Sequence, residues 1–281
     1  MIKKLFFILF PILIYAQDNA DLYPPDSLTI AYHTKWTKNH YKERIAAFKE
    51  DPLKFGDIVF IGNSITEGGK NWSEKFNLPN VRNRGISGDV TDGVLKRLGE
   101  IIYFKPKAVF LLIGINDLFN LYYQKQIPSA KYVGENILKI AHIIKQKSPS
   151  TLVYVQTLLP TDKDFMQNNI DQVNALVKAQ HDDDIFQLID LNKAFSDEQG
   201  FLKKELSEDG THLNKKGYEL WITTEKDILK ALPVTLKDPR LNPIKAIALD
   251  QTQPEDSSFS LNQSWRLSYF FEPFPLCFVR Y

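Results

Sequence analysis

Four short segments, far apart in the chain, carry the residue types needed for acyl transfer. Residues 62–66, 85–89 and 114–117 each follow a strand-like run, and residues 209–212 precede a helix-like stretch. They supply a serine nucleophile, backbone donors, a side-chain amide, and a histidine with a carboxylate three residues before it. Together these groups predict covalent ester chemistry through a stabilised oxyanion.

Ser64 is the candidate nucleophile because it directly follows the first apolar run. In doubly wound sheets ligands bind at the carboxyl ends of the strands, so a serine there points into the binding crevice. Ser64 and Glu67 also fit a capping box, which makes a helix cap the alternative interpretation. The flanking residues do not form Gly-x-Ser-x-Gly, so the nucleophile elbow of α/β-hydrolases is excluded.

Gly88 and Asn116 are the candidate oxyanion donors beside the N–H of Ser64. Gly88 lies in a turn whose N–H can approach a ligand without Cβ hindrance, and Asn116 offers a side-chain amide. Either residue could instead serve only a strand-to-helix turn, where Asp89 or Thr91 is a candidate helix cap. In the strand order 2-1-3-4-5, the loops carrying Gly88 and Asn116 flank Ser64. Topology therefore predicts the oxyanion hole better than either motif does.

His212 is the candidate base, and Asp209 lies three residues before it. A carboxylate in the same loop can fix the imidazole tautomer and stabilise the imidazolium. The alternative is an exposed histidine with Asp209 as a helix cap. The sequence has no Cys/His pattern with metal-ligand spacing, so it predicts neither a metal nor another cofactor.

The elements that must position these residues alternate between strands and helices. Strands are predicted at residues 57–61, 81–84, 108–113, 152–157 and 185–191, and helices at 36–49, 90–104, 130–147, 170–180 and 215–232. Four strands are nearly continuous Val, Ile and Leu runs, typical of strands covered on both faces. The second is short and polar and is assigned by position. The alternation predicts a three-layer α/β/α sandwich around a five-stranded parallel sheet.

Composition and the chain ends limit which partners, cellular location and domain bounds the sequence allows. The 281 residues carry a net charge of +1, which gives no electrostatic argument for a nucleic-acid partner or an anionic membrane. Residues 1–16 read as a signal peptide cleaved after Ala16, with a retained anchor as the alternative and no stable membrane span expected after cleavage. The single cysteine, Cys277, permits no intrachain disulfide and does not lie at a lipoprotein cleavage site. Residues 17–234 are predicted as the catalytic domain and 235–281 as a loose tail.

In this order and spacing, Ser64, Gly88, Asn116 and His212 resemble the four blocks of the SGNH-hydrolase (GDSL-like) superfamily. The resemblance covers about residues 57–232 and implies a flavodoxin-like fold, ester hydrolysis and no metal. It departs at Asn63, where the family often has Asp, and we interpret Asn63 as a local scaffold residue. Residues 63–69 and 84–89 are similar to the platelet-activating-factor-acetylhydrolase-like branch, which implies removal of short acyl groups, often acetyl.

We therefore expect a secreted serine esterase that acts on short-chain, acetyl esters of small molecules or glycans. A lysophospholipase or lipase is the first alternative. A non-catalytic carbohydrate-binding protein on the same fold is the second, although the complete set of site residues argues against it. Four aromatic residues follow the catalytic blocks and could stack on a sugar, line an acyl pocket or belong to the core: Trp72, Phe119, Tyr122 and Tyr123.

Export, to the periplasm or outside the cell, is the first testable expectation. It rests on the Lys3-Lys4 start and the apolar run to Tyr15. Mass spectrometry of the natively expressed protein should find a new N-terminus near Gln17. An intact Met1 on a cytoplasmic protein would contradict it.

Overall fold

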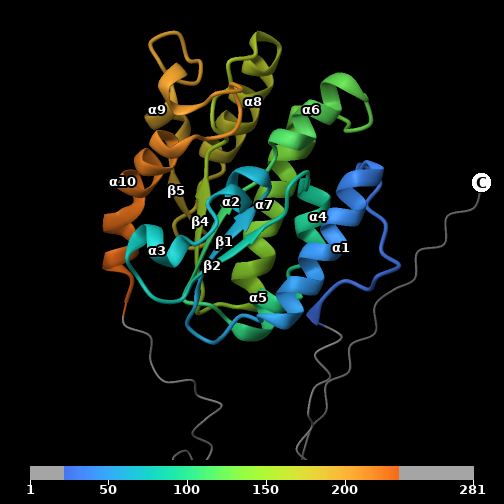
Figure 1. Cartoon of the computed structure of the whole chain (residues 1–281), viewed down its shortest axis with the longest axis vertical. Coiled ribbons are helices and arrows are strands. Elements are labelled where there is room, and N and C mark those ends of the chain that lie inside the picture. Colours follow the sequence, from blue (N-terminus) through green and yellow to red (C-terminus); the bar gives the residue numbers. More distant parts are fainter. Residues whose placement is uncertain (1–21, 234–281) are drawn as a thin grey trace, which may run out of the picture. The chain divides into compact units, whose positions relative to one another are not determined.

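The computed structural model describes residues 22–233, in which five parallel strands form one sheet in the order β2-β1-β3-β4-β5 (Figure 1). The strands are β1 (Ile58–Gly62), β2 (Val81–Gly85), β3 (Ala108–Leu112), β4 (Leu152–Gln156) and β5 (Gln187–Ile189). The α/β class, the parallel sheet and the strand order are confirmed. The predicted signal peptide and the tail at 235–281 lie outside the described residues.

Burial explains why the strands differ in composition. Every residue of the central strands β1 and β3 is buried, as continuous apolar runs require. Strand β2 is polar because it is an edge strand, and Arg82 and Asn83 are only partly buried. Strand β5 is shorter than predicted, because the N–H groups of Ile185 and Phe186 bond to the Asp182 carbonyl in a turn. Leu191, predicted as strand, begins the next helix.

Ten α-helices within residues 22–233 accompany these strands, and helices cover both faces of the sheet (Figure 1). The helices are α1 (Lys35–Glu50), α2 (Ser64–Gly68), α3 (Trp72–Phe76), α4 (Thr91–Leu95), α5 (Gly99–Phe104), α6 (Ile115–Tyr123), α7 (Ala130–Lys147), α8 (Asp164–Ala179), α9 (Leu191–Phe195) and α10 (Lys215–Ala231) within residues 22–233. Helices α3, α9 and α10 lie on one side of the sheet, and α4, α5, α7 and α8 lie on the other (Figure 1). Helix α7 has the predicted bounds, and α8 begins six residues earlier than predicted.

The single helix predicted at 90–104 is wrong, because the chain forms α4 and α5 instead. Two tight bonds end α4, from the N–H of Lys96 to the Gly93 carbonyl and from the N–H of Arg97 to the Val94 carbonyl. Arg97 then turns inward to buried partners under the strand ends. The break between α4 and α5 therefore lets the Arg97 side chain reach these buried partners, which a continuous helix would not permit.

Aromatic rings pack across the middle of the sheet. Phe60 of β1 stacks on Phe110 of β3 with ring centroids 4.7 Å apart, and Phe110 stacks on Tyr154 of β4 at 4.6 Å. Trp72 stacks on Phe60 at 4.6 Å and is fully buried. Trp72 is therefore a core residue, which settles one of the alternatives left open for the aromatic residues.

A buried carboxyl group links β4 to α10. The Gln156 side-chain amide donates to Glu225 Oε1 over 2.5 Å, and burial raises the pKa of Glu225 to about 8. The Gln156 side-chain oxygen is buried and has no hydrogen-bond partner among residues 22–233. Burial therefore favours the neutral acid, and the hydrogen bond from Gln156 opposes this rise in pKa without cancelling it.

Protonation of Glu225 should make stability depend on pH. Because folding raises its pKa from the ordinary 4.5 to about 8, the free energy of unfolding should fall as pH rises between these values. The limiting slope for one proton is about 1.4 kcal/mol per pH unit. Glu225→Gln, which cannot ionise, should lose this slope in urea titrations at pH 5, 6.5 and 8. The control is Glu219→Gln at an exposed position of α10, and identical pH profiles for all three proteins would refute the assignment.

Candidate active site

Four loops bring the predicted site residues to the carboxyl ends of the strands. Ser64 begins α2 directly after β1, Gly88 lies in the loop after β2, and Asn116 lies in the first turn of α6 after β3. Asp209 and His212 lie in the loop before α10. The structure joins the serine, the histidine and the aspartate by direct hydrogen bonds.

Ser64, His212 and Asp209 form one continuous hydrogen-bonded series. Ser64 Oγ lies 2.9 Å from His212 Nε2, and His212 Nδ1 lies 2.7 Å from Asp209 Oδ2. Asp209 Oδ1 also accepts hydrogen bonds from the backbone N–H groups of Thr211 and His212. This arrangement fixes the imidazole with Nδ1 toward the carboxylate and Nε2 toward the serine.

The hydrogen bonds at Asp209 also control its charge. Partial burial alone would raise its pKa, but the bonds from the His212 side chain and from the Thr211 and His212 backbones hold the pKa below its usual range. Asp209 is therefore ionised at neutral pH and favours a proton on Nδ1. It does not cap α10, because Asn214 caps that helix by accepting from the Gly217 N–H.

Asn63, rather than Ser64, caps α2. Its side chain accepts a hydrogen bond from the Ile65 N–H at 3.0 Å, and Ser64 is the first helical residue. The capping-box alternative for Ser64 is therefore wrong, while Asn63 has the scaffold role that we expected. Glu67 does not reach back to the cap. It accepts hydrogen bonds from the N–H and Oγ of Ser87, and thereby ties α2 to the loop that carries Gly88.

Gly88 has φ +79°, a left-handed conformation that favours glycine. A Cβ atom at this position would also collide with Thr37 Cγ2 of α1. The side-chain amide of Asn116 donates to the Asp89 carbonyl at 2.9 Å, which orients it and leaves its second N–H hydrogen for another acceptor. Both candidate oxyanion donors are thus held by their surroundings, Gly88 by sterics and Asn116 by a hydrogen bond.

A buried ion pair beneath these loops is absent from the sequence-based interpretation. Asp89 Oδ2 accepts from Arg97 Nε at 3.0 Å, and its Oδ1 lies 3.2 Å from His33 Nε2. Arg97 also donates to the carbonyls of Gly62 and Arg84, at the ends of β1 and β2. Asp89 is therefore not a helix cap. In the sequence, the only sign of this pair is an Asp and an Arg eight residues apart. That spacing matches no known pattern.

Asp117 adds a second buried carboxyl group beside Asn116. It accepts hydrogen bonds from the N–H and Oγ of Thr91, and burial nevertheless raises its pKa to about 7. The first residue of α4 is thus held by a side chain from the first turn of α6. Val90, at the cap position, makes no side-chain capping bond, so the predicted Thr91 cap is also wrong.

A cavity of about 10 Å³ is lined by chain neighbours of the site residues, although by none of the site residues themselves. This volume holds about one water molecule or methyl group. Ten residues from the ends of β1, β3 and β4 and from the His212 loop line it: Asn63, Ile65, Leu112, Ile113, Ile115, Leu158, Leu159, Pro160, Thr161 and Thr211. The lining is largely apolar, so the cavity suits a small hydrocarbon group.

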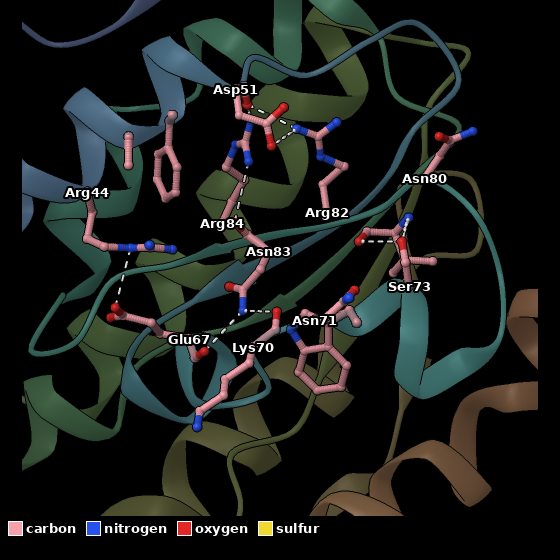
Figure 2. Close-up of a pocket in the computed structure, with 14 residues that line it drawn as sticks. Arg44, Asp51, Glu67, Lys70, Asn71, Ser73, Asn80, Arg82, Asn83 and Arg84 are labelled. Carbon is pink, nitrogen blue, oxygen red and sulfur yellow. Dashed lines mark hydrogen bonds and ion pairs between the residues drawn. The ribbon is translucent and has the colours of Figure 1, made fainter.

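A much larger groove, of about 680 Å³, lies along the outer edge of β2 and contains none of the predicted site residues (Figure 2). It runs between α1 and the segment after α2. Figure 2 shows Arg44 reaching Glu67 and Arg82 reaching Asp51, with nitrogen–oxygen distances of 3.4 Å and 2.6 Å. Size alone therefore does not identify the functional site, and hydrogen-bonding chemistry does.

The other aromatic candidates lie farther along α6. Tyr122 stacks on Phe165 with ring centroids 4.0 Å apart, and Tyr123 stacks on Phe119 at 6.3 Å. Tyr122 and Tyr123 are exposed, so they are not core residues. Residues 22–233 contain no cluster of three His, Cys, Asp or Glu side chains placed to hold a metal ion, and no helix among them is long and apolar enough to span a bilayer.

Fold, site and family model agree on the class of protein. Residues 60–220 match the model of the GDSL-like Lipase/Acylhydrolase family, and the chain belongs to this family. It is an SGNH/GDSL-type serine ester hydrolase, as the order of its motifs predicted.

Three individual proteins show what the chain is similar to. The chain is 29% identical over 194 residues to the human platelet-activating factor acetylhydrolase IB subunit alpha1, covering 66% of this chain and 78% of that protein. A solved GDSL-like lipase from Bacteroides thetaiotaomicron is 24% identical, with a TM-score of 0.56 over 69% of this chain and 97% of that one. An acetylxylan esterase from Geobacillus stearothermophilus is 20% identical, with a TM-score of 0.52 over 65% and 98%.

Proposed function

We propose that this chain is an exported esterase that removes acetyl groups from carbohydrate esters through an acyl-enzyme on Ser64. The observation that carries the proposal is the series Ser64 Oγ to His212 to Asp209, with distances of 2.9 and 2.7 Å. A serine hydroxyl is a weak nucleophile alone, and a base within hydrogen-bond reach activates it. Export rests on residues 1–16 and remains a prediction from the sequence.

The proposed reaction has two halves. His212 Nε2 takes the Ser64 proton while Oγ attacks the ester carbonyl, and the N–H groups of Ser64 and Gly88 and the amide of Asn116 stabilise the oxyanion. The bond to the alcohol oxygen then breaks, and His212 returns its proton to that oxygen. Water, deprotonated by His212, attacks the acyl-enzyme and releases the acid and free Ser64. Asp209 stabilises the imidazolium in both halves.

The size of the small cavity supports acetyl as the acyl group. It is lined by the chain neighbours of Ser64, Asn116 and His212, and it has room for about one methyl group. A long acyl chain would have to displace buried side chains, so the lipase alternative is less compatible with this packing. The names of the relatives, an acetylhydrolase and an acetylxylan esterase, also support acetyl esters, and the second supports a carbohydrate.

Substitution of the three residues tests the mechanism directly. Ser64→Ala should lower kcat/KM for p-nitrophenyl acetate by about 10⁴-fold or more, and His212→Ala should fall close to it. Asp209→Ala should retain more activity, because its side chain is 56% exposed and water can partly replace it. The matched control, Ser150→Ala at an exposed turn, should behave as wild type. A folded His212→Ala protein with most of its activity would rule out this mechanism.

Enlarging the small cavity should change acyl selectivity. Leu158 lines the cavity and packs against Gly114, so Leu158→Ala should admit a longer acyl group. We expect the ratio of kcat/KM for p-nitrophenyl butyrate over acetate to rise roughly tenfold. Leu229→Ala, which truncates a buried leucine of α10 outside the cavity lining, controls for general loosening. An equal rise in both variants, or a wild-type preference for butyrate, would contradict the cavity's role.

A further inference from the structure

Helix α1 brings an exposed tryptophan to the rim of the site. The Trp36 side chain is 61% exposed, whereas Trp72 and Trp221 are fully buried. A single exposed aromatic ring is ordinary on a protein surface, so the position of the indole and its support, rather than its exposure, carry the argument for a binding role. Neither the motifs nor the catalytic series accounts for Trp36.

Trp36 lies beside the oxyanion loop. A Cβ atom built on Gly88 would lie 3.5 Å from the indole carbon Cζ3, which is ordinary van der Waals distance. The neighbouring Thr37 occupies the rest of the space above this glycine. The edge of the indole therefore borders the residue whose N–H we assign to the oxyanion.

The indole is held in place by a network that also holds this loop. Trp36 stacks on His40 with centroids 5.0 Å apart and planes 11° from parallel. His40 Nε2 lies 3.0 Å from Glu67, which also pairs with Arg44 in Figure 2. Glu67 in turn accepts from the N–H and Oγ of Ser87, next to Gly88. One face of the indole is thus covered by His40, and the exposed part is presented by a rigid support.

Strand order assigns the two halves of the ester to different sides of Ser64. The acyl cavity is built from residues at the ends of β1, β3 and β4, whereas Trp36 adjoins the loop after β2. Because β1 lies between β2 and β3, strand order places the cavity toward β3 and the indole toward β2 relative to the loop that carries Ser64. An ester with its acyl group in the cavity therefore directs its alcohol portion toward Trp36.

We propose that Trp36 binds the alcohol portion of the substrate, a pyranose ring whose C–H face stacks on the indole. This inference rests on the proposed function, because it assumes that Ser64 is the nucleophile. The C–H face of one sugar ring matches a single indole surface that His40 supports from the other side. A quaternary ammonium headgroup is the other chemistry that aromatic rings recognise, but it favours a cage of several rings. Among residues 22–233, the only ring that Trp36 stacks on is that of His40, which covers one face of the indole.

The test compares a sugar ester with a small ester in the same protein. Trp36→Ala should lower kcat/KM for acetylated xylobiose about tenfold more than for ethyl acetate, with most of the loss in KM. Trp36→Phe, which keeps a flat ring, should recover most of the difference. Lys42→Ala, at an exposed position of the same helix, should change neither substrate. Equal losses on both esters in Trp36→Ala would overturn the proposal.

Binding without turnover separates this inference from the proposed function. In a Ser64→Ala background, calorimetry with xylotriose should show about tenfold weaker binding when Trp36→Ala is added. An unchanged affinity would overturn the role of Trp36 whatever the catalytic result. A wild-type enzyme active on ethyl acetate or an acetylated phosphocholine lipid, but not on acetylated xylobiose, would overturn the sugar assignment and leave Ser64 intact. Full activity of Ser64→Ala would instead refute the proposed function.

Discussion

The buried ion pair between Asp89 and Arg97 is the interaction on which the site depends. Both side chains are almost completely buried, so loss of either partner would leave an uncompensated charge, at a cost of about 3–5 kcal/mol. Arg97 binds the last carbonyl of β1, just before the nucleophile loop, and the Asp89 backbone carbonyl orients Asn116. A single pair therefore fixes the relative positions of the loops that carry Ser64, Gly88 and Asn116.

Above this buried ion pair, the reacting groups remain accessible to solvent. The side chains of His212 and Asp209 are more than half exposed, and they owe their geometry to hydrogen bonds within their own loop. Rigid loops beneath exposed reacting groups suit a hydrolase, which must admit first an ester and then water. The proposed roles of the small apolar cavity and of Trp36 extend this division, with tight packing for an acyl group and an open aromatic surface for the alcohol portion.

Sequence patterns predicted the parts of the fold that follow from local periodicity. Apolar runs located four of the five strands, and α7 matched its apolar stripe, because burial of a strand or a helix face leaves a repeating signature. The break between α4 and α5 was missed, since it depends on the long-range partners of Arg97. Trp36 was missed for the same reason: α1 meets Gly88 only in the folded chain. Helix caps were assigned to the wrong residues because Asp89, Thr91 and Asp209 all bond to groups outside a helix terminus.

The central claim is that Ser64 is the one serine activated by His212, and a covalent probe tests it most directly. A fluorophosphonate reacts with activated serines, so intact-mass spectrometry should show a single adduct, and peptide mapping should place it on Ser64. The adduct should be lost in Ser64→Ala and should form far more slowly in His212→Ala, with ester hydrolysis falling in step with labelling. An adduct on another serine, or unchanged labelling of the folded His212→Ala protein, would contradict the account.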